Sequence, residues 1–269
     1  MIGYIFAAKL LVAVGVVIAL SIITERVSPR IAGLISGLPT GSAITLFFIG
    51  LENGTEFASH TALYNMVGII AMQGMLFVYY KSSARFKKNS LLLSAVASVA
   101  GYIAIIFLLQ FLVLDKFTAV LLPLASIPVF IYLFRKIEDS KIKDRVKLRA
   151  DVLLGRSIAA GSIILAVTET ASAVGSKLAG LFTAFPTTVF PLILIVHHTY
   201  DAKHVHTIIK NLPVGLASLV AYSLTVSIAY PSIGIYYGTV AAFAAAFVAY
   251  GAIYLLYKQK QRLVLFLGD

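Results

Sequence analysis

Apolar stretches long enough to cross a lipid bilayer recur along almost the whole of this 269-residue chain. A transmembrane helix needs roughly 17 to 25 mostly apolar residues, and about nine segments meet that requirement. They are residues 3–23, 31–50, 61–80, 91–112, 117–134, 152–169, 178–197, 207–229 and 232–257. Lipid offers the backbone no hydrogen bonds, so segments of this length must bond internally as helices. We therefore predict an all-α, polytopic membrane protein with no separate soluble domain.

The composition agrees with this prediction and excludes several kinds of site. Hydrophobic residues make up 60% of the chain and charged residues 12%, which is too little polar material to cover a soluble domain of this size. The absence of cysteine excludes disulfides, thiolate metal ligands and thiol nucleophiles. Residues 3–23 have no basic residue before them and no small-residue cleavage motif after them, so we expect a retained first span.

Basic residues are concentrated in alternate loops. If the loops alternate between the two sides of the membrane, one side receives Arg26, Arg30, Lys81, Arg85, Lys87, Lys88, the basic run within 135–149, Lys203, Lys210, Lys258, Lys260 and Arg262. The other side receives Lys116 and Lys177. Short cytoplasmic loops are enriched in Lys and Arg, so this pattern predicts an inner (plasma) membrane protein with its N-terminus outside and its C-terminus in the cytoplasm.

The same charge distribution bears on partners. The net charge of +11 arises from loop residues that follow the membrane rule, so it does not call for nucleic acid as a partner. The expected partners are membrane lipid and a small solute or ion.

An internal repeat divides the chain. SPRIAGLISGLPTGSAITL at 28–46 aligns without a gap with GSKLAGLFTAFPTTVFPLI at 175–193. In this register Pro39 pairs with Pro186, and Lys9 pairs with Arg156. We predict two four-helix repeats, residues 1–113 and 150–262, joined by a segment at 114–149 that contributes one helix and a basic cytoplasmic loop. The odd helix makes the second repeat enter the membrane from the opposite side, an arrangement that recurs in secondary transporters.

The residues around the first repeat also bring a resemblance. SPRIAGLISGLPTGSAITLFFIGLENG, preceded by a lysine early in the first span, is similar to the GlpM-like (YdgC-like) family of small membrane proteins, and AGLFTAFPTTVFPLILIVHH resembles the same family. The resemblance is strongest over the first two spans of each half. It implies that this chain is a fused, duplicated form of such a protein, and it implies no particular substrate.

The two prolines mark the strongest candidate site. Each lies near the middle of a predicted span, where proline removes a helical hydrogen bond and clashes with the preceding turn. Irregular backbone at membrane depth is tolerated where it is buried in protein or lines a polar cavity. Matching interruptions in both halves therefore predict a central substrate site, and packing kinks are the alternative. The candidate residues are Pro39, Thr40, Ser42, Pro186, Thr187 and Thr188.

Four charged residues complete the candidate substrate site. Lys9 and Arg156 each lie about two turns into the first helix of their repeat, so they either pair with acids, reach the interface, or attract an anionic solute. Glu25 and Glu169 each follow a threonine at a helix end, and they act either as proton or cation sites or as hydrated interfacial carboxylates. The half-helix ends after the breaks also favour an anion, because helix N-termini attract negative charge.

Sequence patterns for other chemistry are weak. His197, His198, His204 and His206 lie near Asp201, but their spacing matches no metal-binding pattern, so we expect a hydrated interfacial loop and no metal or cofactor. The chain has no paired-aspartate, HExxH or phosphate-loop motif, and we do not expect an enzyme. The predicted function is a secondary transporter or permease; an ion channel and a non-transporting assembly component for envelope synthesis are the alternatives.

Overall fold

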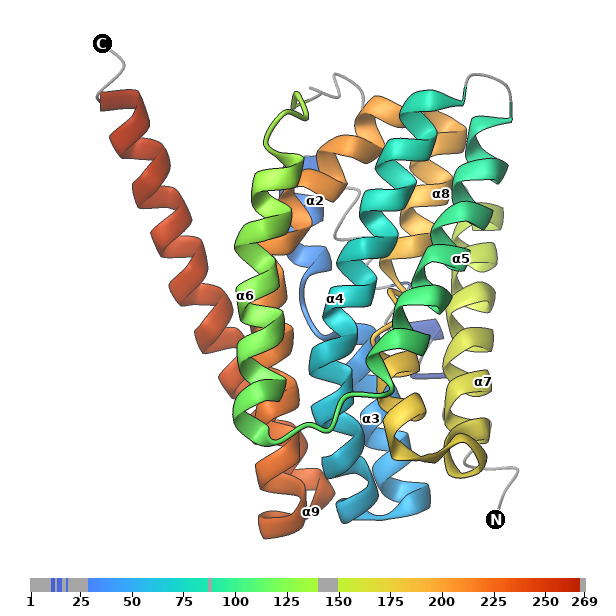
Figure 1. Ribbon diagram of the computed structural model, residues 1–269, viewed down its shortest axis with the longest axis vertical. Helices are drawn as coiled ribbons and strands as arrows, with labels where there is room; N and C mark the ends of the chain where they lie inside the picture. Colours follow the sequence, from blue (N-terminus) through green and yellow to red (C-terminus); the bar gives the residue numbers. More distant parts are fainter. Residues whose placement is uncertain are drawn as a thin grey trace.

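The computed structural model describes residues 29–86, 89–139 and 150–266, together with the single positions 11, 12, 14, 15 and 18. For residues 29–32, 150–153, 156, 159–160 and 256–266 only the backbone is described. Within this part of the chain all regular structure is helical (Figure 1). The predicted all-α class is therefore confirmed for the described residues.

The described helices overlap eight of the nine predicted spans, and most of the predicted span 3–23 lies outside the described residues. They are α2 (Pro29–Ser36), α3 (Thr40–Asn53), α4 (Thr55–Arg85), α5 (Ser90–Leu109), α6 (Lys116–Phe134), α7 (Ala150–Thr183), α8 (Val189–Thr199) and α9 (Ala202–Phe266). The predicted spans 31–50 and 178–197 are each divided by a break at their central prolines.

Two long helices contain a glycine with a positive φ angle. In α7, Gly175 has φ 78°, and in α9, Gly234 has φ 80°. Residues that carry a side chain rarely adopt this backbone conformation, so glycine allows the chain to turn there without steric cost. The predicted spans 207–229 and 232–257 are accordingly separated at Gly234, a few residues later than the sequence pattern placed the boundary.

The central helix of the bundle is α4. Its 31 residues extend about 46 Å at the helical rise, longer than the roughly 30 Å thickness of the bilayer hydrocarbon. It contacts α3, α5, α6, α7 and α9, and 78% of the residues in its most apolar segment are buried. The corresponding buried fractions are 22% for α5 and 28% for α6. Those two helices therefore expose apolar side chains such as Phe107, Leu108 and Val129, as expected for a lipid-facing surface.

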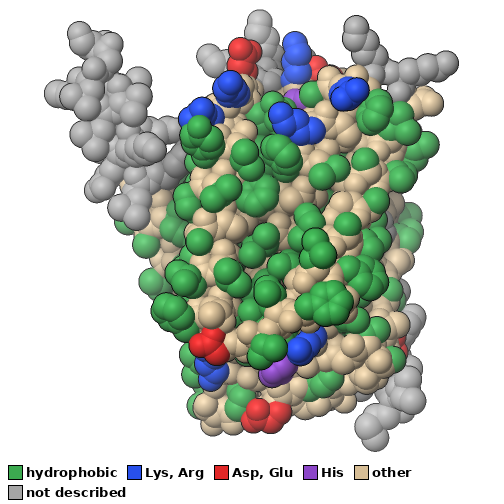
Figure 2. Space-filling model, in the orientation of Figure 1, with side chains coloured by type: hydrophobic (Ala, Val, Ile, Leu, Met, Phe, Trp, Pro, Cys, Tyr) green, Lys and Arg blue, Asp and Glu red, His purple; other side chains and the backbone are tan. Residues whose placement is uncertain are grey.

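The length and composition of the helices are those of a multi-pass membrane protein. Among the described residues, five helical stretches are long and apolar enough to cross a membrane: Gly33–Asn53, Thr55–Arg85, Ser90–Leu109, Lys116–Phe134 and Ala202–Leu255. Figure 2 shows charged side chains gathered at the two ends of the molecule, with a band of hydrophobic side chains between them.

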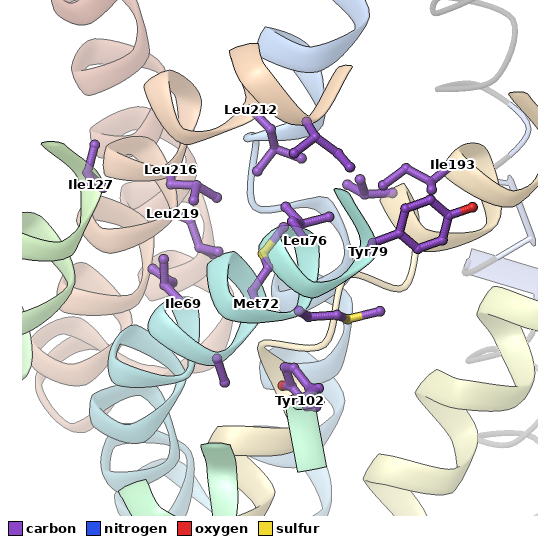
Figure 3. Close-up of a cluster of buried hydrophobic side chains, with 14 of the residues drawn as sticks. Ile69, Met72, Leu76, Tyr79, Tyr102, Ile127, Ile193, Leu212, Leu216 and Leu219 are labelled. Atoms are coloured by element: carbon purple, nitrogen blue, oxygen red, sulfur yellow. The ribbon is translucent and has the colours of Figure 1, made fainter. Parts of the chain in front are cut away.

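The core of the bundle lies where α4 packs against the part of α9 that precedes Gly234. These two segments lie side by side and run in opposite directions, and the rest of α9 turns back along the bundle and leans away from it (Figure 1). Met72 and Leu76 of α4 meet Leu212, Leu216 and Leu219 of α9 in the main hydrophobic cluster (Figure 3). Burial of these side chains aligns the two halves of the chain around a common centre.

Candidate functional site

The breaks at Pro39 and Pro186 have matching backbone hydrogen bonds. At the first break, the N–H of Thr40 donates to Leu38 O at 2.8 Å, and the N–H of Ala43 donates to Pro39 O at 2.7 Å. At the second, the N–H of Thr187 donates to Phe185 O at 2.7 Å, and the N–H of Phe190 donates to Pro186 O at 2.8 Å. Each donor and acceptor of one break aligns with its counterpart in the other.

The chemistry of proline accounts for both breaks. A proline nitrogen carries no hydrogen and its ring crowds the preceding turn, so the incoming helix ends before it. The bonds from Thr40 and Thr187 then tighten the chain, and a new helix begins. The predicted disruption of both spans is confirmed, because α2 is separate from α3 and α7 is separate from α8.

The two breaks lie against each other at the centre of the bundle. The hydroxyl oxygens of Thr40 and Thr188 are 3.4 Å apart. On the opposite side of the contact, a Cβ added to Gly41 would collide with Thr187 Oγ1. In the gap-free alignment Thr40 pairs with Thr187, and Gly41 pairs with Thr188, so the two contacts are counterparts. The absence of a side chain at Gly41 leaves room for the Thr187 hydroxyl.

A small cavity lies at this crossing. Its polar lining includes Ser36, Ser42, Thr187 and Thr188, together with the backbone at Pro39, Gly41 and Pro186. Its apolar wall includes Met72, Leu216 and Leu219, which Figure 3 shows projecting between α4 and α9. The space open to the centre of a water molecule is about 20 Å³, enough for one water-sized species.

One cavity side chain lacks a hydrogen-bond partner. Thr187 Oγ1 is buried without a partner in the described part of the protein, and the residue is only 4% exposed. A buried hydroxyl without a partner costs free energy, so its retention calls for an explanation such as a bound species.

A buried polar cluster centred on Asn65 of α4 adjoins the cavity. Asn65 Nδ2 donates to Ser42 Oγ at 3.2 Å and to Thr183 Oγ1 at 2.7 Å. Asn65 Oδ1 accepts a hydrogen bond from Ser223 Oγ at 2.7 Å. Asn65 is completely buried, and its partners belong to α3, α7 and α9. This Asn65 cluster therefore connects the segments around the two breaks to α4 and α9.

Several glycines allow close approach of the helices around the site. A Cβ added to Gly33 would collide with Ile208 O, and one added to Gly180 would collide with Thr61 O. Glycine reduces the distance between helix axes and brings backbone atoms into van der Waals contact, as is common in membrane bundles. The packing at the centre is therefore tight except at the cavity.

Another of these contacts joins α9 to the chain just before the first break. Gly37 and Gly215 meet backbone to backbone, and Gly68 in turn packs against Ala184. Neither glycine of the first pair has room for a methyl group. This contact closes the bundle beside the cavity.

The structure brings together the six predicted site residues at the breaks. Pro39, Ser42, Pro186, Thr187 and Thr188 line the cavity, and Thr40 contacts Thr188 beside it.

The four predicted charged residues are placed differently. Lys9 and Glu25 lie outside the described residues, and for Arg156 only the backbone, within α7, is described. Glu169 is exposed on α7 and does not line the cavity.

Sequence reasoning missed Asn65, Thr183 and Ser223. The amide of Asn65 within the apolar segment 61–80 was a usable signal, because polar side chains within spans seek partners inside the protein. Thr183 and Ser223 carried no such signal, since a hydroxyl can bond to its own helix backbone.

The histidines at one end of the bundle bind neighbouring helices. Tyr79 Oη and His197 Nδ1 are 2.7 Å apart, and Ser83 Oγ and His206 Nε2 are 2.8 Å apart. These contacts connect the end of α4 to α8 and to the start of α9.

At the same end, Asp201 accepts hydrogen bonds from His204. Partial burial raises the pKa of the Asp201 carboxyl, but the backbone and ring hydrogen bonds from His204 and the charge of that ring outweigh the effect, so the pKa lies below its ordinary value. A polar cavity of about 360 Å³ lies nearby, bordered by Tyr80, Lys136, Lys203 and His206.

The chain matches no protein-family model, and comparisons with curated proteins and with solved structures yield no match.

Proposed function

We propose that this protein is a secondary transporter or permease for a small solute, with its substrate site at the crossing of the two broken helices. The observation that carries the proposal is the meeting of two matched helix breaks at a buried, hydroxyl-lined cavity. Secondary transporters bind substrate near the bilayer midplane at discontinuous helices contributed by both halves of the fold.

We further propose that the fold consists of two inverted four-helix repeats within about nine spans. Reciprocal contacts support this: Gly33 packs against Ile208, as Gly180 packs against Thr61. When the register that aligns Pro39 with Pro186 is continued along the chain, each of these contacts is the counterpart of the other. The opposite directions of α4 and the first part of α9 support inversion (Figure 1).

The proposed origin and orientation follow from the sequence. The chain is a fused, duplicated form of a GlpM-like small membrane protein. The end that carries Lys81, Arg85, Arg135 and Lys136 faces the cytoplasm of the inner (plasma) membrane, since basic residues are enriched on that side.

In this mechanism the described conformation is closed around the site. The cavity has room for one water-sized species, and the Gly37–Gly215 contact beside it is tight. Relative motion of the halves would open the crossing first to one side of the membrane and then to the other. The solute would meet hydroxyl and backbone groups at the breaks in both states.

The tight glycine packing also favours a second candidate, a non-transporting membrane component. A bundle that only assembles with other proteins would show similar close contacts, with the cavity as a local packing defect. An ion channel is a third possibility that needs no alternating access.

A reversible cross-link distinguishes these functions. The chain has no cysteine, so Thr40→Cys combined with Thr188→Cys places the only two thiols at the crossing, where the native hydroxyls are 3.4 Å apart. Uptake of radiolabelled or dye-reported solutes is measured in proteoliposomes, with each single cysteine variant as a control. An alternating-access transporter stops when the disulfide forms and recovers on reduction.

The other outcomes overturn the proposal. Unchanged flux after complete oxidation indicates a channel of fixed conformation. An absence of flux for every solute tested in the native protein indicates a non-transporting component.

A further inference from the structure

We infer that the central cavity binds a small inorganic anion of about the size of a water molecule, such as fluoride or chloride, through backbone amides and hydroxyl groups. The inference rests on the proposed function and specifies the substrate class of the same site. It depends on the direction of the two new helices, the unpartnered Thr187 hydroxyl and the size of the cavity.

Both helices that follow the breaks direct their N-termini toward the cavity. In α3, the N–H groups of Thr40 and Ala43 donate to carbonyls of the break, and Gly41 and Ser42 lie between them in the first turn. First-turn amides have no acceptor within their own helix. Gly41 and Ser42 both line the cavity.

The second helix repeats this arrangement. In α8, Phe190 donates to Pro186 O, and the preceding amides of Thr188 and Val189 belong to cavity-lining residues. Two helix N-termini from different halves therefore converge on one space. Each contributes partial positive charge, and together with their free amides they form a site suited to an anion.

The hydroxyl of Thr187 is an independent sign of a ligand. The Thr187 side chain is more than nine-tenths buried, its Oγ1 lacks a protein partner among the described residues, and this oxygen lies directly against Gly41 at the start of α3. A bound anion would accept the hydroxyl hydrogen and remove the cost of the unmade bond.

The lining disfavours the other classes of solute. A divalent cation would need carboxylate ligands, and no carboxylate is among the described lining residues. A space of about 20 Å³ excludes a sugar, an amino acid or a phosphate ester from this conformation. A monatomic anion fits both the polarity and the size.

The test measures anion flux in proteoliposomes that contain the full chain. Vesicles are loaded with potassium fluoride, potassium chloride or potassium gluconate, and valinomycin carries the counter-ion while ion-selective electrodes record release. Gluconate serves as the size control. We expect release of the halides above that of protein-free vesicles and no release of gluconate.

Thr187→Val removes the hydroxyl while keeping the side-chain volume. A hydrogen bond to a charged group is strong enough that its loss reduces halide release at least about tenfold. Thr225→Val is the matched control, because Thr225 on α9 donates to its own helix at Ala221 O and does not line the cavity. Thermal unfolding provides a second readout. We expect halides to raise the unfolding midpoint of the native protein but not that of Thr187→Val. In gluconate, the two proteins should unfold at the same temperature or Thr187→Val at a higher one.

Two results would overturn the inference alone. One is halide release by Thr187→Val at the native rate. The other is release of a neutral probe such as glycerol by vesicles that retain halides. In that case the protein transports a different substrate, so the proposed function stands and the anion inference is wrong. Vesicles impermeable to halides, sodium, potassium and glycerol alike would overturn the proposed function together with the inference.

Discussion

Replacing Asn65 with leucine tests whether the buried polar cluster holds the two halves together. Asn65→Leu removes the hydrogen bonds to Ser42, Thr183 and Ser223 and keeps a side chain of similar size. In membrane bundles a side-chain hydrogen bond contributes about 0.6 kcal/mol on average, so three contribute about 2 kcal/mol. We therefore expect the free energy of unfolding to fall by about 2 kcal/mol.

The assay is reversible unfolding in mixed detergent micelles, followed by circular dichroism. Asn53→Leu is the control, because among the described residues the Asn53 amide donates to Ile49 O of its own helix and to no other group. A double-mutant cycle with Ser223→Ala isolates one contact and should give a coupling of about 0.6 kcal/mol, with an upper limit near 1.7 kcal/mol. If Asn65→Leu costs no more than Asn53→Leu, the cluster does not stabilise the fold and the reasoning is wrong.

Three further predictions concern packing, orientation and pH. Gly215→Ala should destabilise the protein by about 1–3 kcal/mol in the same unfolding assay, because a methyl group has no room there. Gly155→Ala should not destabilise it, because no described residue lies within contact distance of a Cβ at that position. Equal effects would contradict the packing argument. A single cysteine at Glu56 should react with a membrane-impermeant maleimide from outside, and one at Lys81 only after permeabilisation; the reverse pattern would invert the proposed topology. The pKa of Asp201 is lowered in the folded state, so the carboxylate stabilises the fold at pH values above the ordinary pKa of about 4, and this stabilisation is lost as the pH falls below it. The thermal unfolding midpoint of the native protein should therefore fall between pH 6 and pH 3. In Asp201→Asn this fall should be smaller.

The sequence carried the information about class and about the location of the breaks. Long apolar segments must form helices in lipid, so an all-α membrane protein followed from their length. A proline inside a helix removes a hydrogen bond, but Pro123 and Pro128 lie within α6 and Pro213 lies within α9, so proline alone does not decide where a helix ends. Pro39 and Pro186 identified the breaks because they align in the internal repeat and have glycine or threonine next to them. The alignment of the two prolines also predicted that the two breaks belong to one site. In the structure the two breaks lie against each other.

Helix boundaries were less predictable at glycine. Gly175 lies in the polar stretch between the predicted spans 152–169 and 178–197, and Gly234 lies within the predicted span 232–257, so neither glycine marked a boundary. The turn at each glycine depends on a positive φ angle that glycine permits but does not require. The apolar pattern alone therefore ended the segment 152–169 before the helix ends and placed the boundary near Gly234 slightly early.

Only the tertiary structure decided which polar groups find partners. Asn65 was not among the predicted site residues, and its bonds to Ser42, Thr183 and Ser223 depend on which faces of α3, α4, α7 and α9 meet. Thr187 was a candidate like its neighbours, yet packing left its hydroxyl unpaired beside the cavity. Composition and local backbone preference act within a segment, whereas hydrogen-bond satisfaction arises between segments that are distant along the chain and meet only in the folded bundle.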